Sequence, residues 1–120
     1  MGICLEVLLV KSLKFNLDFY QPIIEEVKIA TSRVNDKGLS VDEEFEFVFM
    51  YENDSLISEL SGLKGVIRKV ETVRFGDLTN YHATLEGYLH KNLLKRELKR
   101  FYPNINGDSI VYIYRFKLKN

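Results

Sequence analysis

An alternating aromatic run in the middle of the chain constrains the fold more than any other feature. Phe45, Phe47, Phe49 and Tyr51 occupy every second position of residues 44–51, with acidic or aliphatic residues between them. Successive side chains of a strand point to opposite faces, so this pattern predicts a strand with one buried aromatic face. A face of four large rings must be covered by another layer of strands or helices.

Four further segments complete the predicted sheet. Residues 3–10 form an apolar run broken only by Glu6, which is typical of a buried strand, and residues 28–34 also look extended. Residues 65–75 and 109–117 alternate like the aromatic run. The shared faces would carry Val66, Arg68, Val70, Thr72 and Arg74 in the first of these, and Ile110, Tyr112, Tyr114 and Phe116 in the second.

Two helices are predicted beside these strands. Residues 16–26 have apolar side chains at helical spacing, with Pro22 expected near the helix start or as a distortion. Residues 91–102 form an amphipathic helix that Pro103 ends. Its apolar stripe would consist of Leu94, Leu98 and Phe101. Residues 80–89 fit a strand or a helix equally well.

Together these segments predict an α+β domain: a small closed or half-open mixed barrel of about five to six strands with two to three short peripheral helices. A chain of 120 residues with 46% hydrophobic content fits a single domain, residues 1–120, with one core.

Charge is unevenly distributed along the chain. The formal net charge is zero, but residues 1–60 hold 12 acidic and 5 basic side chains, and residues 61–120 hold 5 acidic and 12 basic ones. The halves therefore carry −7 and +7. Such asymmetry is typical of a surface that binds a polyanion, although pairing between the two halves would also account for it.

Cysteine and histidine content limits the chemistry. The single Cys4 cannot form an internal disulfide, and its apolar neighbours favour a buried hydrophobic role. His82 and His90 offer too few partners for a zinc site or a histidine-based triad, so we expect no metal and no cofactor. No apolar run reaches the roughly 20 residues of a membrane-spanning helix, and the first residues do not resemble a signal peptide. We therefore expect a cytoplasmic protein without membrane contact.

A short polar cluster lies in residues 28–33. Thr31 and Arg33 are two positions apart on a predicted strand, so their side chains share a face. Lys28 precedes them, where a turn can bring it to the same pocket. If Lys28 is buried beside a second cation, its pKa falls and the amine can accept a proton. The pattern also fits a plain strand threonine and an arginine that binds phosphate or pairs with a nearby acid.

The second half of the chain is similar to the ASCH (activating signal cointegrator homology) family, particularly its compact archaeal and bacterial members. The resemblance rests on Phe75-Gly76-Asp77-Leu78-Thr79, His82-Ala83, Glu86-Gly87-Tyr88, a basic helix, Phe101-Tyr102-Pro103 and a final strand. In the first half, Lys28, Thr31 and Arg33 resemble the family's K-x-x-T-x-R signature, so the likeness covers nearly the whole chain. Two departures are Glu26-Val27, where the family commonly has Gly, and Ser40-Val41-Asp42, where it commonly has Gly-Asp.

The resemblance implies a PUA-like mixed barrel in which residues 78–86 form a short helix. In family members described as acetylcytidine amidohydrolases, the residues matching Lys28, Thr31 and Glu86 form the active site. Amide hydrolysis needs a nucleophile, a base and an acid for the leaving nitrogen. Thr31 would be the nucleophile or a hydrogen-bond donor, Lys28 the base, and Glu86 the proton carrier. The alternative is an ordinary Lys28–Glu86 salt bridge that closes the cleft.

A basic surface gives a second hypothesis, in which phosphates lie beside the cleft. Its predicted residues are Arg33, Arg74, Lys91, Lys95, Lys99 and Arg100, with Lys64, Arg68 and Lys69 nearby and Tyr81, Tyr88 and Tyr102 as stacking faces. The sequence thus predicts an ASCH-type protein that binds RNA or a modified nucleoside. The alternatives are a metal-independent amidohydrolase acting on N4-acetylcytidine-like substrates and, after it, a ribonuclease. The oligomeric state is left open.

Overall fold

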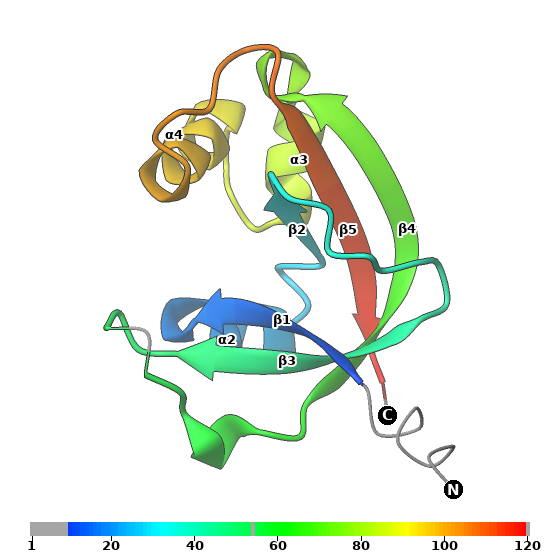
Figure 1. Cartoon of the computed structure of the whole chain (residues 1–120). Helices are drawn as coiled ribbons and strands as arrows, with labels where there is room; N and C mark the ends of the chain where they lie inside the picture. Colours follow the sequence, from blue (N-terminus) through cyan, green and yellow to red (C-terminus); the bar gives the residue numbers. More distant parts are fainter. Residues whose placement is uncertain (1–9, 54, 120) are drawn as a thin grey trace, which may run out of the picture.

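The computed structural model describes residues 10–53 and 55–119 and shows a curved five-stranded mixed sheet with three short helices (Figure 1). The strands are β1 (Lys11–Asn16), β2 (Ala30–Arg33), β3 (Glu44–Met50), β4 (Lys64–Arg74) and β5 (Ile110–Leu118). Their order in the sheet is β1-β3-β4-β5-β2. β1 pairs with β3 in parallel, and the other pairs are antiparallel. The α+β class is confirmed.

The sheet does not close in the described part of the chain. β1 and β2 are its two ends, and no ladder joins them there. β3 pairs with β4 only through residues 44–46, after which β4 leaves β3 and continues with β5. Figure 1 shows the result: β1 and β3 run across the lower end of a long, curved β4–β5 ribbon. The predicted barrel closure is therefore not confirmed.

The helices and 3-10 turns fill the connections. The segment after β1 forms η1 (Leu17–Phe19) and α2 (Tyr20–Ile24), η2 (Ser58–Leu60) precedes β4, and η3 (Phe75–Asp77) follows it. The ambiguous segment is helical: α3 (Asn80–Leu85) begins at Thr79, whose hydroxyl accepts from the His82 backbone N–H. α4 (Lys91–Phe101) ends just before Pro103, as predicted. No helix in these described ranges is long and apolar enough to cross a membrane.

Two clusters of buried side chains hold the layers together. The alternating aromatic run forms the first: Phe45, Phe47 and Phe49 are buried and pack against Phe15 of β1 and Phe116 of β5. The second lies on the opposite face of β5, where Val111 and Ile113 pack against α3 and α4. β5 is therefore buried on both faces, because its two faces meet different layers.

A β-bulge interrupts the alternation that was predicted for β4. The register with β5 shifts between Ile67 and Lys69, so Arg68 is the extra residue. Ile67 is fully buried and Val70 packs against the same aromatic cluster, although strict alternation would place them on opposite faces. The predicted common face from Val66 to Arg74 is therefore wrong.

Three side chains are more exposed than their sequence patterns predict. Tyr51, predicted on the buried aromatic face, is 50% exposed, Phe101 of the predicted apolar stripe of α4 is 58% exposed, and Ile110 at the start of β5 is 44% exposed. Tyr51 lies just after β3, and the other two lie at element ends, beyond the layers that cover their neighbours. The predicted strand over residues 3–10 lies outside the described residues except for Val10, and Cys4 lies outside them as well.

Gly65 lies where β4 crosses the aromatic cluster. A Cβ atom there would come within 2.8 Å of Phe45 Cζ and of Phe47 Cε2. We expect Gly65→Ala to lower the free energy of unfolding by about 1–3 kcal/mol, because the rings have no free space to move into. Gly107→Ala is the matched control: its Cβ would meet nothing within 4 Å, so chemical denaturation should show no loss of stability. Equal effects at the two positions would contradict this packing.

Candidate functional site

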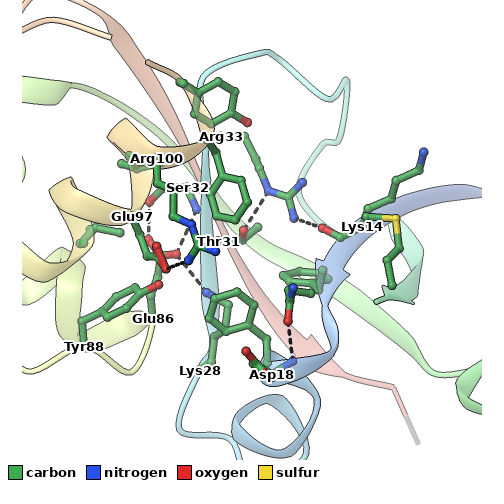
Figure 2. A pocket seen from close by; sticks show the side chains of 18 of the residues that line it. Lys14, Asp18, Lys28, Thr31, Ser32, Arg33, Glu86, Tyr88, Glu97 and Arg100 are labelled. Carbon is green, nitrogen blue, oxygen red and sulfur yellow. Dashed lines mark hydrogen bonds and ion pairs between the residues drawn. The ribbon is translucent and has the colours of Figure 1, made fainter. Parts of the chain in front are cut away.

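A cleft of about 430 Å³ lies between the two ends of the sheet (Figure 2). One wall comes from β1 and η1, the floor from β2, and the other wall from α4 with the segment that precedes it. The four residues predicted to line the cleft, Lys28, Thr31, Arg33 and Glu86, all do so. The cleft thus lies between β1 and β2, the two end strands that would pair with each other in a closed barrel.

A buried ion pair forms the centre of the cleft. Lys28 Nζ lies 3.0 Å from Glu86 Oε1, and the two side chains are 2% and 5% exposed. The Lys28 ammonium also lies 4.6 Å from the centroid of the Phe19 ring. A buried charge requires a partner, so each member of the Lys28–Glu86 pair compensates the charge of the other.

Ser32 completes this cluster, and the sequence prediction did not include it. Its backbone N–H donates to Glu86 Oε1 over 3.3 Å, and its hydroxyl donates to Glu86 Oε2. Ser32 is also buried and lines the cleft. The only sequence signal for it was its place between Thr31 and Arg33. Alternation along the strand indicated Thr31 and Arg33 as the side chains that face the site. Ser32 also reaches the site, because β2 is an end strand and its free edge borders the cleft.

Thr31 and Arg33 form a second group, across the cleft from Glu86 (Figure 2). Arg33 Nε donates to Thr31 Oγ1 over 3.0 Å, which confirms that the two side chains share a face. Arg33 Nη2 donates to the Lys14 carbonyl of β1 over 2.6 Å, and the guanidinium lies 5.0 Å from the Phe15 ring centroid. Arg33 therefore ties the two ends of the sheet together.

Backbone contacts explain why residues far apart in the sequence meet here. The Ile29 N–H donates to the Leu85 carbonyl over 2.7 Å, which places the segment before β2 against the end of α3. Glu86 caps that helix and is followed by Gly87, whose φ of 84° turns the chain away. The carboxylate is thereby directed at Lys28, 58 positions earlier.

In two turns where ASCH proteins commonly have glycine, this chain has other residues in the positive-φ conformation that glycine usually adopts. Glu26 has a φ of 58° and Asp42 a φ of 70°, both in the left-handed region. The turn before Lys28 is therefore formed despite the substitution, at a cost in backbone strain.

Relief of this strain should stabilise the fold. We expect Glu26→Gly to raise the free energy of unfolding by up to about 1 kcal/mol, because glycine adopts positive φ without a Cβ clash. The neighbouring Glu25 has a φ of −82°, so Glu25→Gly should instead lower it by about 0.5–1 kcal/mol. Urea denaturation of both variants checks the prediction, and destabilisation by both would oppose it.

Burial determines the electrostatics of the cleft. It lowers the pKa of Lys28, and the nearby Arg33 lowers it further, while the charge and hydrogen bond of Glu86 act in the opposite direction. Burial also lowers the pKa of Arg33 and raises the pKa of Tyr88, with the Glu86 charge adding to the second effect. The cleft therefore favours uncharged groups unless they are paired.

Most of the predicted basic residues do not line the cleft itself. Of the predicted residues on α4, Arg100 lines the cleft. Lys91, Lys95, Lys99 and Arg74 are not among the described residues that line it. Lys95 Nζ and Lys99 Nζ lie 5.7 and 5.8 Å from the Phe75 ring centroid, on the side of α4 that faces η3. Tyr88 and Tyr102 line the cleft, and the exposed Tyr81 does not.

The arrangement offers both recognition and proton transfer. Glu86 can accept a hydrogen bond from a ligand N–H, and Lys28 and Arg33 can donate to carbonyl oxygens or phosphates. The carboxylate is also a proton acceptor within reach of a hydroxyl. In the described ranges no group of three or more His, Cys, Asp or Glu side chains is placed to hold a metal ion.

Comparison with known proteins relates the chain to solved structures only. No protein-family model and no curated protein sequence matches it. Protein EF3133 from Enterococcus faecalis V583, of the family DUF984, is similar with a TM-score of 0.62 and 17% identity, over 82% of this chain and 65% of that one. The chain thus spans about two thirds of the length of that protein.

Two further structures are similar over more of their length. The ASCH domain from Lactobacillus crispatus JV V101 matches with a TM-score of 0.57 and 17% identity, over 91% of this chain and 79% of that one. The hypothetical protein PH0355 matches with a TM-score of 0.62 and 11% identity, over 92% of this chain and 100% of that one. At these identities the likeness concerns the fold, and this chain has the fold of an ASCH domain.

Proposed function

We propose that the cleft binds a single nucleoside, either free or as an unpaired nucleotide of RNA. The observation that carries this proposal is the Lys28–Glu86 pair inside a cleft of about 430 Å³, a size within the range of small-molecule sites. An acceptor beside a donor matches the edge of a nucleobase, which presents N–H groups next to carbonyl or ring-nitrogen acceptors. Tyr88, Phe101 and Tyr102 supply ring faces for stacking.

The charge of the cleft supports a nucleoside rather than a run of phosphates as the ligand inside it. Its lining has four basic side chains, Lys14, Lys28, Arg33 and Arg100, and four acidic ones, Asp18, Glu52, Glu86 and Glu97. A groove that follows a phosphate backbone would be strongly positive. We place the phosphates of an RNA ligand outside the cleft, on the face of α4 that carries Lys95 and Lys99.

Titration calorimetry with cytidine, N4-acetylcytidine and a short single-stranded RNA containing N4-acetylcytidine tests this function. We expect at least one nucleoside to bind with little salt dependence, because the cleft charges balance. RNA binding should weaken as the salt concentration rises. The slope of the logarithm of the association constant against the logarithm of the salt concentration should become less negative by roughly 0.7 for each phosphate that Lys95→Glu or Lys99→Glu no longer neutralises. Absence of saturable binding by all three ligands would refute the proposal.

A second candidate function is metal-independent hydrolysis of an amide such as that of N4-acetylcytidine. The observation that favours it is the hydrogen bond between a buried hydroxyl and the buried Glu86 carboxylate, with Lys28 on the other oxygen. The net reaction would consume one water molecule, break the C–N bond and give acetate and cytidine. Release of acetate from N4-acetylcytidine in the presence of a chelator measures this activity directly.

A further inference from the structure

We infer that the activated hydroxyl of this cleft belongs to Ser32 and not to Thr31. The inference rests on the proposed acyl-hydrolase function and assigns its nucleophile. A hydroxyl is a weak nucleophile until a base lies within hydrogen-bond reach of its proton. Ser32 meets that condition, because its hydroxyl donates to Glu86 Oε2 in the floor of the cleft.

Thr31 does not meet this condition. Its Oγ1 accepts a hydrogen bond from Arg33 Nε, a permanent cation that cannot take up a proton. Of the two adjacent hydroxyls, one therefore faces a carboxylate and the other a guanidinium. Figure 2 shows this separation, with Ser32 directed toward Glu86 and Lys28, and Thr31 toward Arg33.

Three donors hold the Glu86 carboxylate in place. Oε1 accepts from Lys28 Nζ over 3.0 Å and from the Ser32 backbone N–H over 3.3 Å, while Oε2 accepts from the Ser32 hydroxyl. The hydroxyl and the N–H come from the same residue, so base and nucleophile are fixed relative to each other. Lys28 orients the base, as the third member of a catalytic triad does.

The reaction balances in two steps. The Ser32 oxygen attacks the acyl carbon, its proton moves to Glu86 Oε2 and then to the leaving nitrogen, and the C–N bond breaks to release an amine and leave an acyl ester on Ser32. A water molecule then attacks the ester carbon and gives its proton to Glu86, which returns it to the serine oxygen. The products are an amine, a carboxylic acid and the unchanged protein.

The test uses p-nitrophenyl acetate as an activated acetyl donor. Acid quenching followed by peptide mass spectrometry should find one acetyl group on Ser32, removable by alkaline hydroxylamine as an oxygen ester is and a lysine amide is not. Ser32→Ala should lose this label and slow the burst of p-nitrophenol at least about 100-fold. Thr31→Val should still be labelled at Ser32. Ser58→Ala, an exposed serine of η2, should match the wild type in both label and burst.

Folding and nucleoside binding are followed in parallel. If Ser32→Ala fails to fold, Ser32→Cys keeps a hydrogen-bond donor and should take the acetyl group as a thioester. Ester-linked acetyl on Thr31, or its absence from Ser32 in the folded wild type, overturns the inference. Nucleoside binding without acylation would leave the proposed binding function intact, whereas acylation without nucleoside binding would retain Ser32 and reject the nucleoside as ligand.

Discussion

Glu86→Gln should lower the free energy of unfolding by about 3–5 kcal/mol at neutral pH. The substitution leaves the Lys28 ammonium almost fully buried with no anion beside it, since its hydrogen-bonded partner is Glu86 Oε1 at 3.0 Å. Glu97→Gln is the matched control in the same cleft. Glu97 is 30% exposed and pairs with Arg100 over 3.4 Å, so its loss should cost less than about 0.5 kcal/mol.

The cost of Glu86→Gln should shrink as the pH rises. Burial already lowers the pKa of Lys28 from 10.5, and the variant removes the two influences of Glu86 that raise it. Between this lowered folded-state pKa and 10.5 the unfolded chain binds more protons, so the free energy of unfolding increases with pH in that window. Denaturation measured from about pH 7 to about pH 10 should show a decreasing difference in the free energy of unfolding between the variant and the wild type. A gap that widens would contradict a buried, unpaired lysine.

Lys28→Met should reduce kcat/KM for N4-acetylcytidine by at least about 100-fold. Without the ammonium, Glu86 loses the charged donor that orients its carboxylate, so the oxygen that accepts the serine proton is no longer held against the Ser32 hydroxyl. The stability cost should be smaller than for Glu86→Gln, because Ser32 still gives Glu86 two hydrogen bonds.

The control for Lys28→Met is Lys117→Met, an exposed lysine of β5. Its kcat/KM should stay within about twofold of the wild type, since exposed charges distant from a site contribute little to it. Acetate release per folded molecule is the measurement, with thermal unfolding as a check of the fold. A Lys28→Met variant that folds and keeps wild-type turnover would remove Lys28 from the chemistry.

The strands and helices were predicted well where the sequence pattern is local. The aromatic alternation of β3, the amphipathic α4 and its end before Pro103 follow from periodicity and turn chemistry. The β4 pattern failed at Arg68, because a bulge depends on the partner strand and not on the residues beside it.

The site was predicted in part. Lys28 and Glu86 meet as the family likeness implied, and Thr31 and Arg33 share a face as strand geometry requires. Ser32 was missed because its role depends on the free edge of β2. The lysines of α4 were predicted to contact phosphates beside the cleft, and that role stays a prediction, because a sequence shows which residues are basic but not which helix face meets which neighbour.

The sequence by itself determined four of the five strands, the helix α4 and the types of polar side chain available, because neighbouring residues decide backbone conformation and local amphipathicity. It did not predict β1, and the helix predicted over residues 16–26 is divided into η1 and α2. Only the tertiary structure decided that the sheet stays open between β1 and β2, that Glu86 meets Ser32 as well as Lys28, and that Lys95 and Lys99 lie beside the Phe75 ring. Each of these depends on packing between segments distant along the chain, where burial and hydrogen-bond pairing outweigh local preference.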